Sequence, residues 1–313
     1  MIEKNYNYSE ITYQSSDGIH TVHASLYTPK SKTARGILQL SHGMVDHVGR
    51  YEELANYLTG EGFILAGNCH LGHGKTANLH EDRGFFAHRN GTEYLIKDLH
   101  KMNRYLRDTF PTLPVIMMGH SMGSFLARLY VEKYPHTVKG VIIHCTAGPN
   151  RLVPLGKLLA KTVGFFRGER YRSRIVERLA FLYYNKRFPG EGEYAWLSRD
   201  TEMVSDKAKD ELSSFRFTVS AYSDLFRMLG ECNGRKWFSL YPREMPTLIM
   251  SGENDPVGNY NKGNTKVYKE LLIAGVKNVK MKTYPGARHE LFNEINREEV
   301  YSDVAAWLSE ICR

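Results

Sequence analysis

Three residues that together can carry out acyl transfer occur in order along this chain. Ser121 lies between two glycines in the run 119–123 (GHSMG), and Asp255 and His289 follow downstream. A serine hydroxyl is a poor nucleophile near neutral pH, so it needs a base to take its proton and a group to orient that base. We expect Ser121 to be the nucleophile, His289 the base and Asp255 the orienting carboxylate.

The serine lies where a strand pattern changes into a helix pattern. Residues 114–118 (PVIMM) are typical of a buried strand, and residues 125–130 (FLARLY) are typical of a helix. This is the context of a nucleophile elbow, a sharp turn that leaves almost no room for side chains two residues before and after the serine. The glycines at 119 and 123 meet that requirement. The helix then directs its first N–H groups at a developing oxyanion, and we assign the N–H of Met122 to that role.

The two proposed partners of Ser121 also follow strand patterns. Asp255 comes after 246–251, and His289 comes after 279–284. The carboxyl ends of parallel strands converge on the active site in open α/β sheets, and Ser, Asp, His is the chain order of α/β-hydrolases. The alternative for Asp255 is a turn residue, with Glu253 as a rival carboxylate. The alternative for His289 is a surface position.

A second oxyanion donor is expected after an early strand. Residues 36–40 (GILQL) read as that strand and residues 41–44 (SHGM) as the loop that follows it. In this chain order the loop contributes one backbone N–H to the oxyanion hole. We assign the N–H of Met44 to it.

The rest of the chain supplies the elements that such a site needs. Patterns typical of strands alternate with patterns typical of helices. The predicted strands before residue 150 are 21–27, 36–40, 63–69, 114–118 and 138–144, with helices at 51–60 and 91–110. The alternation resumes in 246–251, 267–274, 279–284 and 300–311. This order predicts an α/β-hydrolase fold, in which a mostly parallel sheet carries helices on both faces.

A helical and aromatic segment interrupts this alternation. We therefore expect a catalytic core in two parts, residues 1–149 and 238–313, with an inserted helical cap at 150–237, here called the cap segment. The formal charge of the chain is +8, and residues 151–187 hold ten basic and two acidic side chains, which equals that whole excess. No nucleic-acid-binding motif accompanies the basic residues, so nucleic acid is not an expected partner, whereas contact of this segment with anionic lipid head groups stays open as an option.

The beginning of the cap segment is amphipathic. One helical face carries Leu155, Leu158, Leu159, Thr162, Val163 and Phe166, which are apolar apart from the threonine, and Lys157 and Lys161 fall on the other face. Burial of the apolar face on the core is the simpler expectation. The alternative is that this face borders an acyl-chain tunnel, with Leu155, Leu159 and Phe166 as candidate substrate-binding residues, or touches a membrane.

Several other kinds of site have no support in the sequence. The four cysteines show no CxxC spacing, and the run 69–73 (CHLGH) lacks the second ligand pair that a structural zinc site uses. There is no glycine-rich phosphate-binding motif. The first residues do not resemble a secretory signal, and no apolar run is long enough to span a bilayer. We expect a cytoplasmic protein, with peripheral membrane association as an option, and neither a metal nor an organic cofactor.

Four runs in order make this chain resemble monoacylglycerol lipases and bacterial lysophospholipases, within the larger group that includes serine aminopeptidases. The runs are 41–51 (SHGMVDHVGRY), 119–124 (GHSMGS), 251–255 (SGEND) and 284–290 (YPGARHE), with weaker similarity at 198–200 and 217–219. Residues 69–74 (CHLGHG) depart from the family's usual DHRGHG, which removes an Asp and an Arg but no member of the triad.

The resemblance implies hydrolysis of monoacylglycerol or lysophospholipid esters through an acyl-enzyme, without a cofactor. Two alternatives stay open. One is a general carboxylesterase or an aminopeptidase of the same fold. The other is a catalytically silent member that binds a lipid-like ligand.

Overall fold

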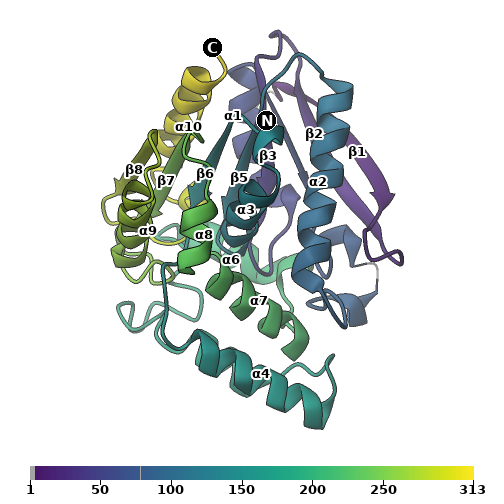
Figure 1. The fold of residues 1–313 in the computed structure, drawn as a ribbon, viewed down its shortest axis with the longest axis vertical. Coiled ribbons are helices and arrows are strands. Elements are labelled where there is room, and N and C mark those ends of the chain that lie inside the picture. The colour runs from purple at the N-terminus through teal and green to yellow at the C-terminus, as the bar shows by residue number, and fades with distance from the viewer. Residues whose placement is uncertain (1–3, 78) are drawn as a thin grey trace.

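A central sheet organises the molecule (Figure 1). The computed structural model describes residues 4–77 and 79–313. The strands of this sheet are β1 (Tyr6–Gln14), β2 (Thr21–Pro29), β3 (Gly36–Ser41), β4 (Phe63–Asn68), β5 (Val115–His120), β6 (Gly140–His144), β7 (Thr247–Gly252) and β8 (Val279–Tyr284). Within the described residues the sheet has eight strands in the order β1-β2-β4-β3-β5-β6-β7-β8. All pairs from β4 to β8 are parallel, which confirms the predicted α/β-hydrolase fold.

The parallel strands form because their sequences are nearly continuous apolar runs. Strands β3, β4, β5, β6 and β7 are buried along their whole length. Strands with this character need cover on both faces of a sheet. One face is covered by α1 (Glu52–Gly60) and α10 (Arg297–Ile311), and the other by α2 (Gly91–Thr109), α3 (Met122–Lys133) and α9 (Lys262–Ile273).

Strand β1 was not predicted from the sequence. It pairs with β2 in antiparallel register, and β2 in turn is antiparallel to β4, so this edge departs from the parallel arrangement. Most side chains of β1 are exposed, and its burial pattern does not alternate cleanly. An edge strand with so few buried side chains leaves little hydrophobic periodicity in the sequence, which explains the omission.

The segment between β6 and β7 is helical, as its sequence indicates. It contains α4 (Val153–Arg167), α5 (Arg174–Ala180), α6 (Thr201–Lys209), α7 (Val219–Glu231) and α8 (Arg235–Leu240). Helix α7 packs on α2 and α3, and α4 packs on α7, so α4 lies farthest from the sheet (Figure 1). The indole N–H of Trp237 in α8 donates to the carbonyl of Arg128 (2.9 Å), which ties α8 to α3. We therefore retain residues 150–237 as the proposed bounds of the cap, although α8 continues past residue 237.

Helix α4 presents a different face to the protein from the one that its leucines suggest. Gly156 of α4 faces the ring of Phe226 in α7, where a Cβ would lie 3.0 Å from the ring, so a small residue at this position lets the two helices approach closely. Leu155, Leu158 and Phe166 are exposed, and Leu159 is only partly buried. The expectation that the leucine-rich face is buried on the core is therefore wrong. No helix of residues 4–77 and 79–313 is both long and apolar enough to cross a bilayer.

Candidate active site

Ser121 occupies the turn between β5 and α3 in a strained conformation. Its φ of 52° and ψ of −120° lie in a region that non-glycine residues rarely adopt, which costs about 1–3 kcal/mol. The Ser121 N–H donates to the carbonyl of His144 (3.0 Å), and the Ser124 hydroxyl donates to the carbonyl of Ser121 (2.5 Å). The serine is partly exposed, whereas its neighbours in the turn are buried. The surrounding contacts thus hold an accessible hydroxyl at the carboxyl edge of the sheet.

The two glycines of the turn are required by close backbone contacts. A Cβ on Gly119 would lie 2.2 Å from the carbonyl oxygen of Gly123. A Cβ on Gly123 would lie 2.0 Å from the carbonyl oxygen of Ser41, at the end of β3. Both distances are far below any real carbon–oxygen contact, so the spacing of small residues seen in the sequence has a steric cause.

Asp255 and His289 lie together at the same edge of the sheet. The Nδ1 of His289 is 3.0 Å from Oδ1 of Asp255, and both residues are buried. The backbone N–H of Val257 also donates to Oδ1 of Asp255 (2.9 Å). The rival carboxylate Glu253 is instead exposed and accepts a hydrogen bond from the N–H of Gly286 (2.9 Å). The structure thus pairs the predicted histidine with Asp255 rather than with Glu253.

The ring of His120 connects this pair to the serine turn. Its centroid is 4.9 Å from the centroid of His289, and His120 directly precedes Ser121. The predicted nucleophile, base and orienting carboxylate therefore follow three different strand ends at the same edge of the sheet, and His120 lies between the serine and the Asp255–His289 pair.

The loop after β3, residues 42–47, lies against the serine turn. A Cβ on Gly43 would be 3.3 Å from the Cβ of Ser121, so the loop backbone passes directly beside the serine. The N–H of Gly43 donates to Asp46 (3.2 Å), and the N–H of Val45 donates to Nε2 of His73 (3.2 Å). Among the described residues, the N–H of Met44 between them donates to no protein group. The loop geometry is compatible with the oxyanion role assigned to Met44.

A buried ion-pair network supports this loop. Arg50 donates to Asp46 (3.1 Å) and to Glu290 (2.6 Å), and Tyr51 donates its hydroxyl to Asp46 (2.7 Å). Burial opposes ionisation of Glu290, but Arg50 and then Lys207 bring the pKa of its carboxyl down to about 2. Burial likewise opposes ionisation of Asp46, but Arg50 holds its pKa well below the ordinary value. Both carboxylates are therefore charged at neutral pH.

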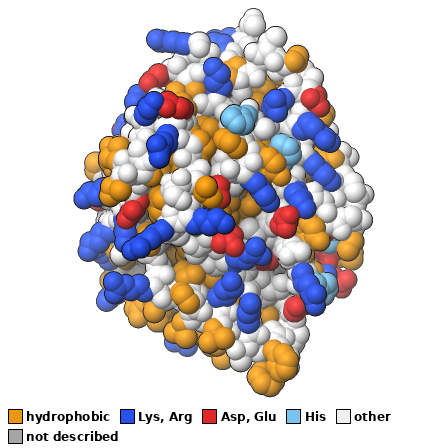
Figure 2. Space-filling model, viewed as in Figure 1, with side chains coloured by type: hydrophobic (Ala, Val, Ile, Leu, Met, Phe, Trp, Pro, Cys, Tyr) orange, Lys and Arg blue, Asp and Glu red, His pale blue; other side chains and the backbone are white. Residues whose placement is uncertain are grey.

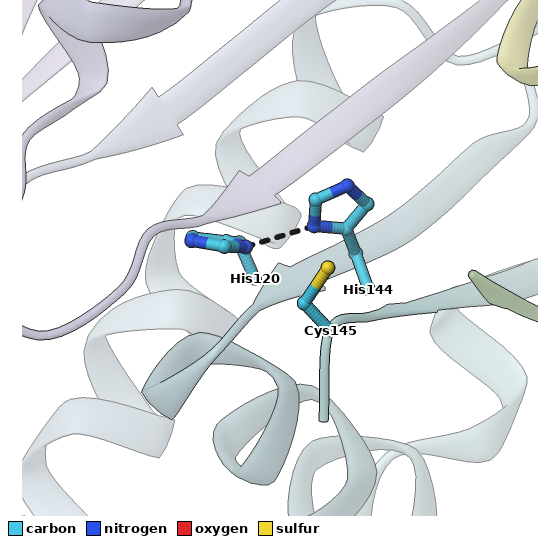
Figure 3. Close-up of side chains that lie close together, drawn as sticks. All are labelled: His120, His144 and Cys145. Atoms are coloured by element: carbon cyan, nitrogen blue, oxygen red, sulfur yellow. Dashed lines mark hydrogen bonds between the residues drawn. The ribbon is translucent and has the colours of Figure 1, made fainter. Parts of the chain in front are cut away.

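Two histidines and a cysteine form a buried cluster at the serine turn (Figure 3). The Nδ1 atoms of His120 and His144 are 2.8 Å apart, and the sulfur of Cys145 lies near them. This separation is that of a hydrogen bond, whereas two nitrogens on one tetrahedral zinc lie roughly 3.3 Å apart. Burial and the nearby His289 lower the pKa of His120 to about 3, so its ring stays neutral. We interpret the cluster as a neutral hydrogen-bonded support for the turn.

Aromatic residues of the cap segment cover His289. The ring of Trp196 is 5.2 Å from that of His289, and Tyr184 contacts Trp196 with ring centroids 4.9 Å apart. The N–H of Glu290 donates to the carbonyl of Leu197 (2.7 Å), so the cap segment is also tied to this loop through its backbone.

Sequence reasoning missed these cap contacts, because no periodicity distinguishes Trp196 from other cap aromatics. It also assigned no role to Asp46, Arg50 and Glu290, although the family-like runs contain all three. The candidate substrate-binding residues Leu155, Leu159 and Phe166 lie on α4, which packs on α5 and α7.

Comparisons with known proteins give a consistent result. A family model described as serine aminopeptidase, S33, matches residues 32–296. A monoacylglycerol lipase from Mycolicibacterium smegmatis is 25% identical over 312 residues, which cover 96% of this chain and 96% of that protein. A monoglyceride lipase from Homo sapiens is 24% identical over 296 residues, which cover 91% of this chain and 86% of that protein. The crystal structure of a highly thermostable carboxyl esterase from Bacillus coagulans in complex with glycerol is similar with a TM-score of 0.91, at 28% identity and with 98% and 99% of the two chains covered.

Proposed function

This chain belongs to the serine aminopeptidase S33 family of α/β-hydrolases, and from that premise we propose that it hydrolyses carboxylic esters of lipid-like substrates through an acyl-enzyme at Ser121. The observation that carries the proposal is the buried Asp255–His289 pair beside a strained, accessible serine. Nucleophilic catalysis requires an accessible serine next to an oriented histidine. Here the serine lies in a strained turn that only flanking glycines allow.

In the proposed mechanism, His289 acts first as a base and then as an acid. His289 takes the proton from Ser121 Oγ as that oxygen attacks the ester carbonyl, and Asp255 stabilises the resulting imidazolium. The N–H groups of Met44 and Met122 donate to the oxyanion. His289 then protonates the leaving alcohol oxygen, and a water molecule repeats the sequence on the acyl-enzyme to release the acid. These steps need no metal or organic cofactor.

We propose monoacylglycerols or lysophospholipids as the substrate class. The relatives from Mycolicibacterium smegmatis and Homo sapiens are named for monoglyceride hydrolysis, and the similar Bacillus coagulans structure is a complex with glycerol. The aromatic ring of Trp196 beside His289, with Tyr184 packed against it, suits an acyl chain better than a charged peptide terminus. A general carboxylesterase and an aminopeptidase remain the alternatives within this fold.

The test is the Ser121→Ala variant with p-nitrophenyl esters of short and long acyl chains. We expect wild-type protein to turn over the esters and the variant to lose all measurable turnover. Labelling of wild-type protein by a fluorophosphonate, and its absence in the variant, checks the nucleophile independently. Turnover by the variant near the wild-type rate refutes the assignment, and failure of the wild type to react with either reagent supports the silent ligand-binding alternative.

A substrate panel distinguishes the remaining hydrolase classes. Faster cleavage of long-chain monoacylglycerols or lysophospholipids than of short esters supports the lipid proposal. Faster cleavage of short esters, or of aminoacyl amides, supports the carboxylesterase or the aminopeptidase instead.

We further propose that α4 docks the protein peripherally on an anionic membrane. Leu158 and Phe165 expose 62% and 84% of their surface, and Leu155 and Phe166 beside them are also exposed. Figure 2 shows hydrophobic side chains gathered at the lower end of the molecule, over α4, with Lys and Arg side chains next to them. An apolar patch with a basic surround is the combination that interfacial helices use.

A further inference from the structure

A lysine of the cap segment reaches the loop beside Ser121. Lys207 lies near the end of α6, and its ammonium donates to the carbonyl of Val45 (3.1 Å). The N-terminus of helix α6 is capped by Asp200, whose carboxylate accepts hydrogen bonds from the N–H groups of Glu202 and Met203. The lysine therefore extends from a defined helix rather than from a flexible connection.

A second contact joins the same two segments. The Nε2 of His47 is 2.8 Å from Oδ2 of Asp210, the residue that follows α6. Asp210 is itself fixed, because it accepts from the Ser213 hydroxyl (2.7 Å) and from the Leu212 N–H (2.9 Å). The cap segment thus holds loop 42–47 at Val45 and at His47, on either side of Asp46.

The charge of Lys207 balances the buried network behind the loop. Asp46 and Glu290 carry two negative charges, and Arg50 supplies only one positive charge. Burial lowers the pKa of the Lys207 ammonium below its ordinary value, and the nearby Arg50 acts in the same direction. The carboxylates of Glu290, Asp46 and Asp210 act to raise it. Lys207 is also the second cation, after Arg50, that lowers the pKa of Glu290. The ammonium is therefore held among opposite charges rather than free in solvent.

Loop 42–47 needs such support because its backbone is strained. Val45 has a φ of 52°, a conformation that β-branched residues strongly disfavour. Asp46 holds the near end of this turn through the Gly43 N–H, and Lys207 holds the far end through the Val45 carbonyl. The N–H of Met44 lies between these two anchors.

We propose that Lys207 is a positioning residue for the oxyanion hole, by which the cap segment fixes the Met44 N–H toward the reacting carbonyl. This inference rests on the proposed function of Ser121. It makes catalysis depend on the position of the cap segment, because any movement that withdraws Lys207 also frees the Val45 carbonyl. The lysine does not touch the substrate in this role.

The experiment compares Lys207→Met, which keeps the length of the side chain and removes the donor, with Lys207→Arg, which keeps a cationic donor. The matched control is Lys209→Met, because Lys209 is exposed on the same helix. Three quantities are measured for each: kcat and KM on a p-nitrophenyl ester, and the second-order rate of fluorophosphonate labelling. The phosphonyl oxygen of that probe occupies the oxyanion hole, so labelling reports on the hole without the acyl chain.

We expect Lys207→Met to lose roughly 10-fold or more in both kcat and labelling rate, with KM within about twofold of wild type, since a displaced donor costs less than the 100-fold of a removed one. Lys207→Arg restores most of both rates, and Lys209→Met changes neither. If Lys207→Met does not fold, Lys207→Gln carries the same test with a neutral polar side chain. The proposal is overturned if the Met or Gln variant keeps the wild-type kcat and labelling rate, or if only its KM changes, by a rise. Wild-type protein that the probe does not label overturns the function of Ser121 instead, which separates the two failures.

Discussion

At the scale of single residues, two neighbouring side chains serve two separate networks. His289 turns toward Asp255, and Glu290 turns toward Arg50. One peptide bond therefore connects the proposed proton-transfer pair to the ion pairs that support the loop beside Ser121. A change in the second network should appear first as a change in stability, since Glu290 is buried and carries a charge.

Glu290→Gln tests the contribution of this buried charge. The carboxyl has a pKa of about 2 in the folded protein against 4.5 as its ordinary value. Because the folded pKa is the lower one, the charge stabilises the fold above about pH 4.5, and this stabilisation disappears as the pH falls toward 2. The difference corresponds to roughly 3 kcal/mol at neutral pH. We expect urea unfolding at pH 7 to show the variant less stable than wild type by about that amount.

The pH series supplies the discriminating measurement for Glu290. A protonated glutamate resembles glutamine, so the gap between the two unfolding free energies should narrow steadily from pH 5 to pH 3. The control is Glu93→Gln, which removes an exposed carboxylate paired with Lys97 and should change stability little at any pH. A gap that stays constant across the series would show that the loss comes from packing rather than from charge.

At the scale of elements, the turn between β5 and α3 carries the strictest steric requirement in the site. Gly123→Ala places a methyl group 2.0 Å from the Ser41 carbonyl oxygen, so the turn or β3 must move. We expect fluorophosphonate labelling of Ser121 to fall at least about 100-fold, comparable with removal of an oxyanion donor, and stability to fall by about 1–3 kcal/mol.

Gly230→Ala in α7 is the matched control for the glycine substitution. There the new methyl group would lie 3.4 Å from the side chain of Val153 in α4, which is an ordinary contact between two helices. We expect unchanged labelling and an unfolding free energy raised by up to about 1 kcal/mol, because alanine favours the helix. Equal labelling rates in the two variants would contradict the steric account of the elbow.

The same elements show how far the sequence predicts the structure. Strands β3 to β7 are recognisable because burial on both faces leaves continuous apolar runs, whereas the exposed edge strand β1 leaves no such signal. Ser121, Asp255 and His289 were identified because each follows a strand at a predictable edge. Lys207 was not, because its target lies 162 residues away along the chain and its own helix has no unusual pattern. For α4, the sequence shows an amphipathic pattern but does not show which face of the helix is buried, because that depends on the close packing of its glycine face on α7.

At the scale of the whole molecule, charge and apolar surface are concentrated in the same segment. The excess of +8 equals the excess within residues 151–187, and the exposed side chains of α4 lie inside that range. At a membrane surface, anionic lipid head groups attract the basic residues and acyl chains accept the apolar side chains. Both interactions therefore favour the same orientation of the protein on the membrane. The rest of the chain is close to neutral, so attraction to an anionic surface would turn the cap segment toward the bilayer.

The double variant Leu158→Ser, Phe165→Ser tests this orientation, with Ile273→Ser as its control. Ile273 is as exposed as Phe165 but lies at the end of α9. Partial burial of two large apolar side chains is worth about 3 kcal/mol, so we expect the double variant to partition onto anionic vesicles roughly 100-fold more weakly than wild type. Ile273→Ser should bind as wild type does, and both variants should keep wild-type hydrolysis of a soluble p-nitrophenyl ester.

Binding of wild-type protein should also weaken with added salt and on neutral vesicles, because the basic residues contribute an electrostatic attraction that salt screens. Equal and negligible sedimentation of wild-type protein with both kinds of vesicle would contradict membrane docking and leave the exposed face of α4 without this role.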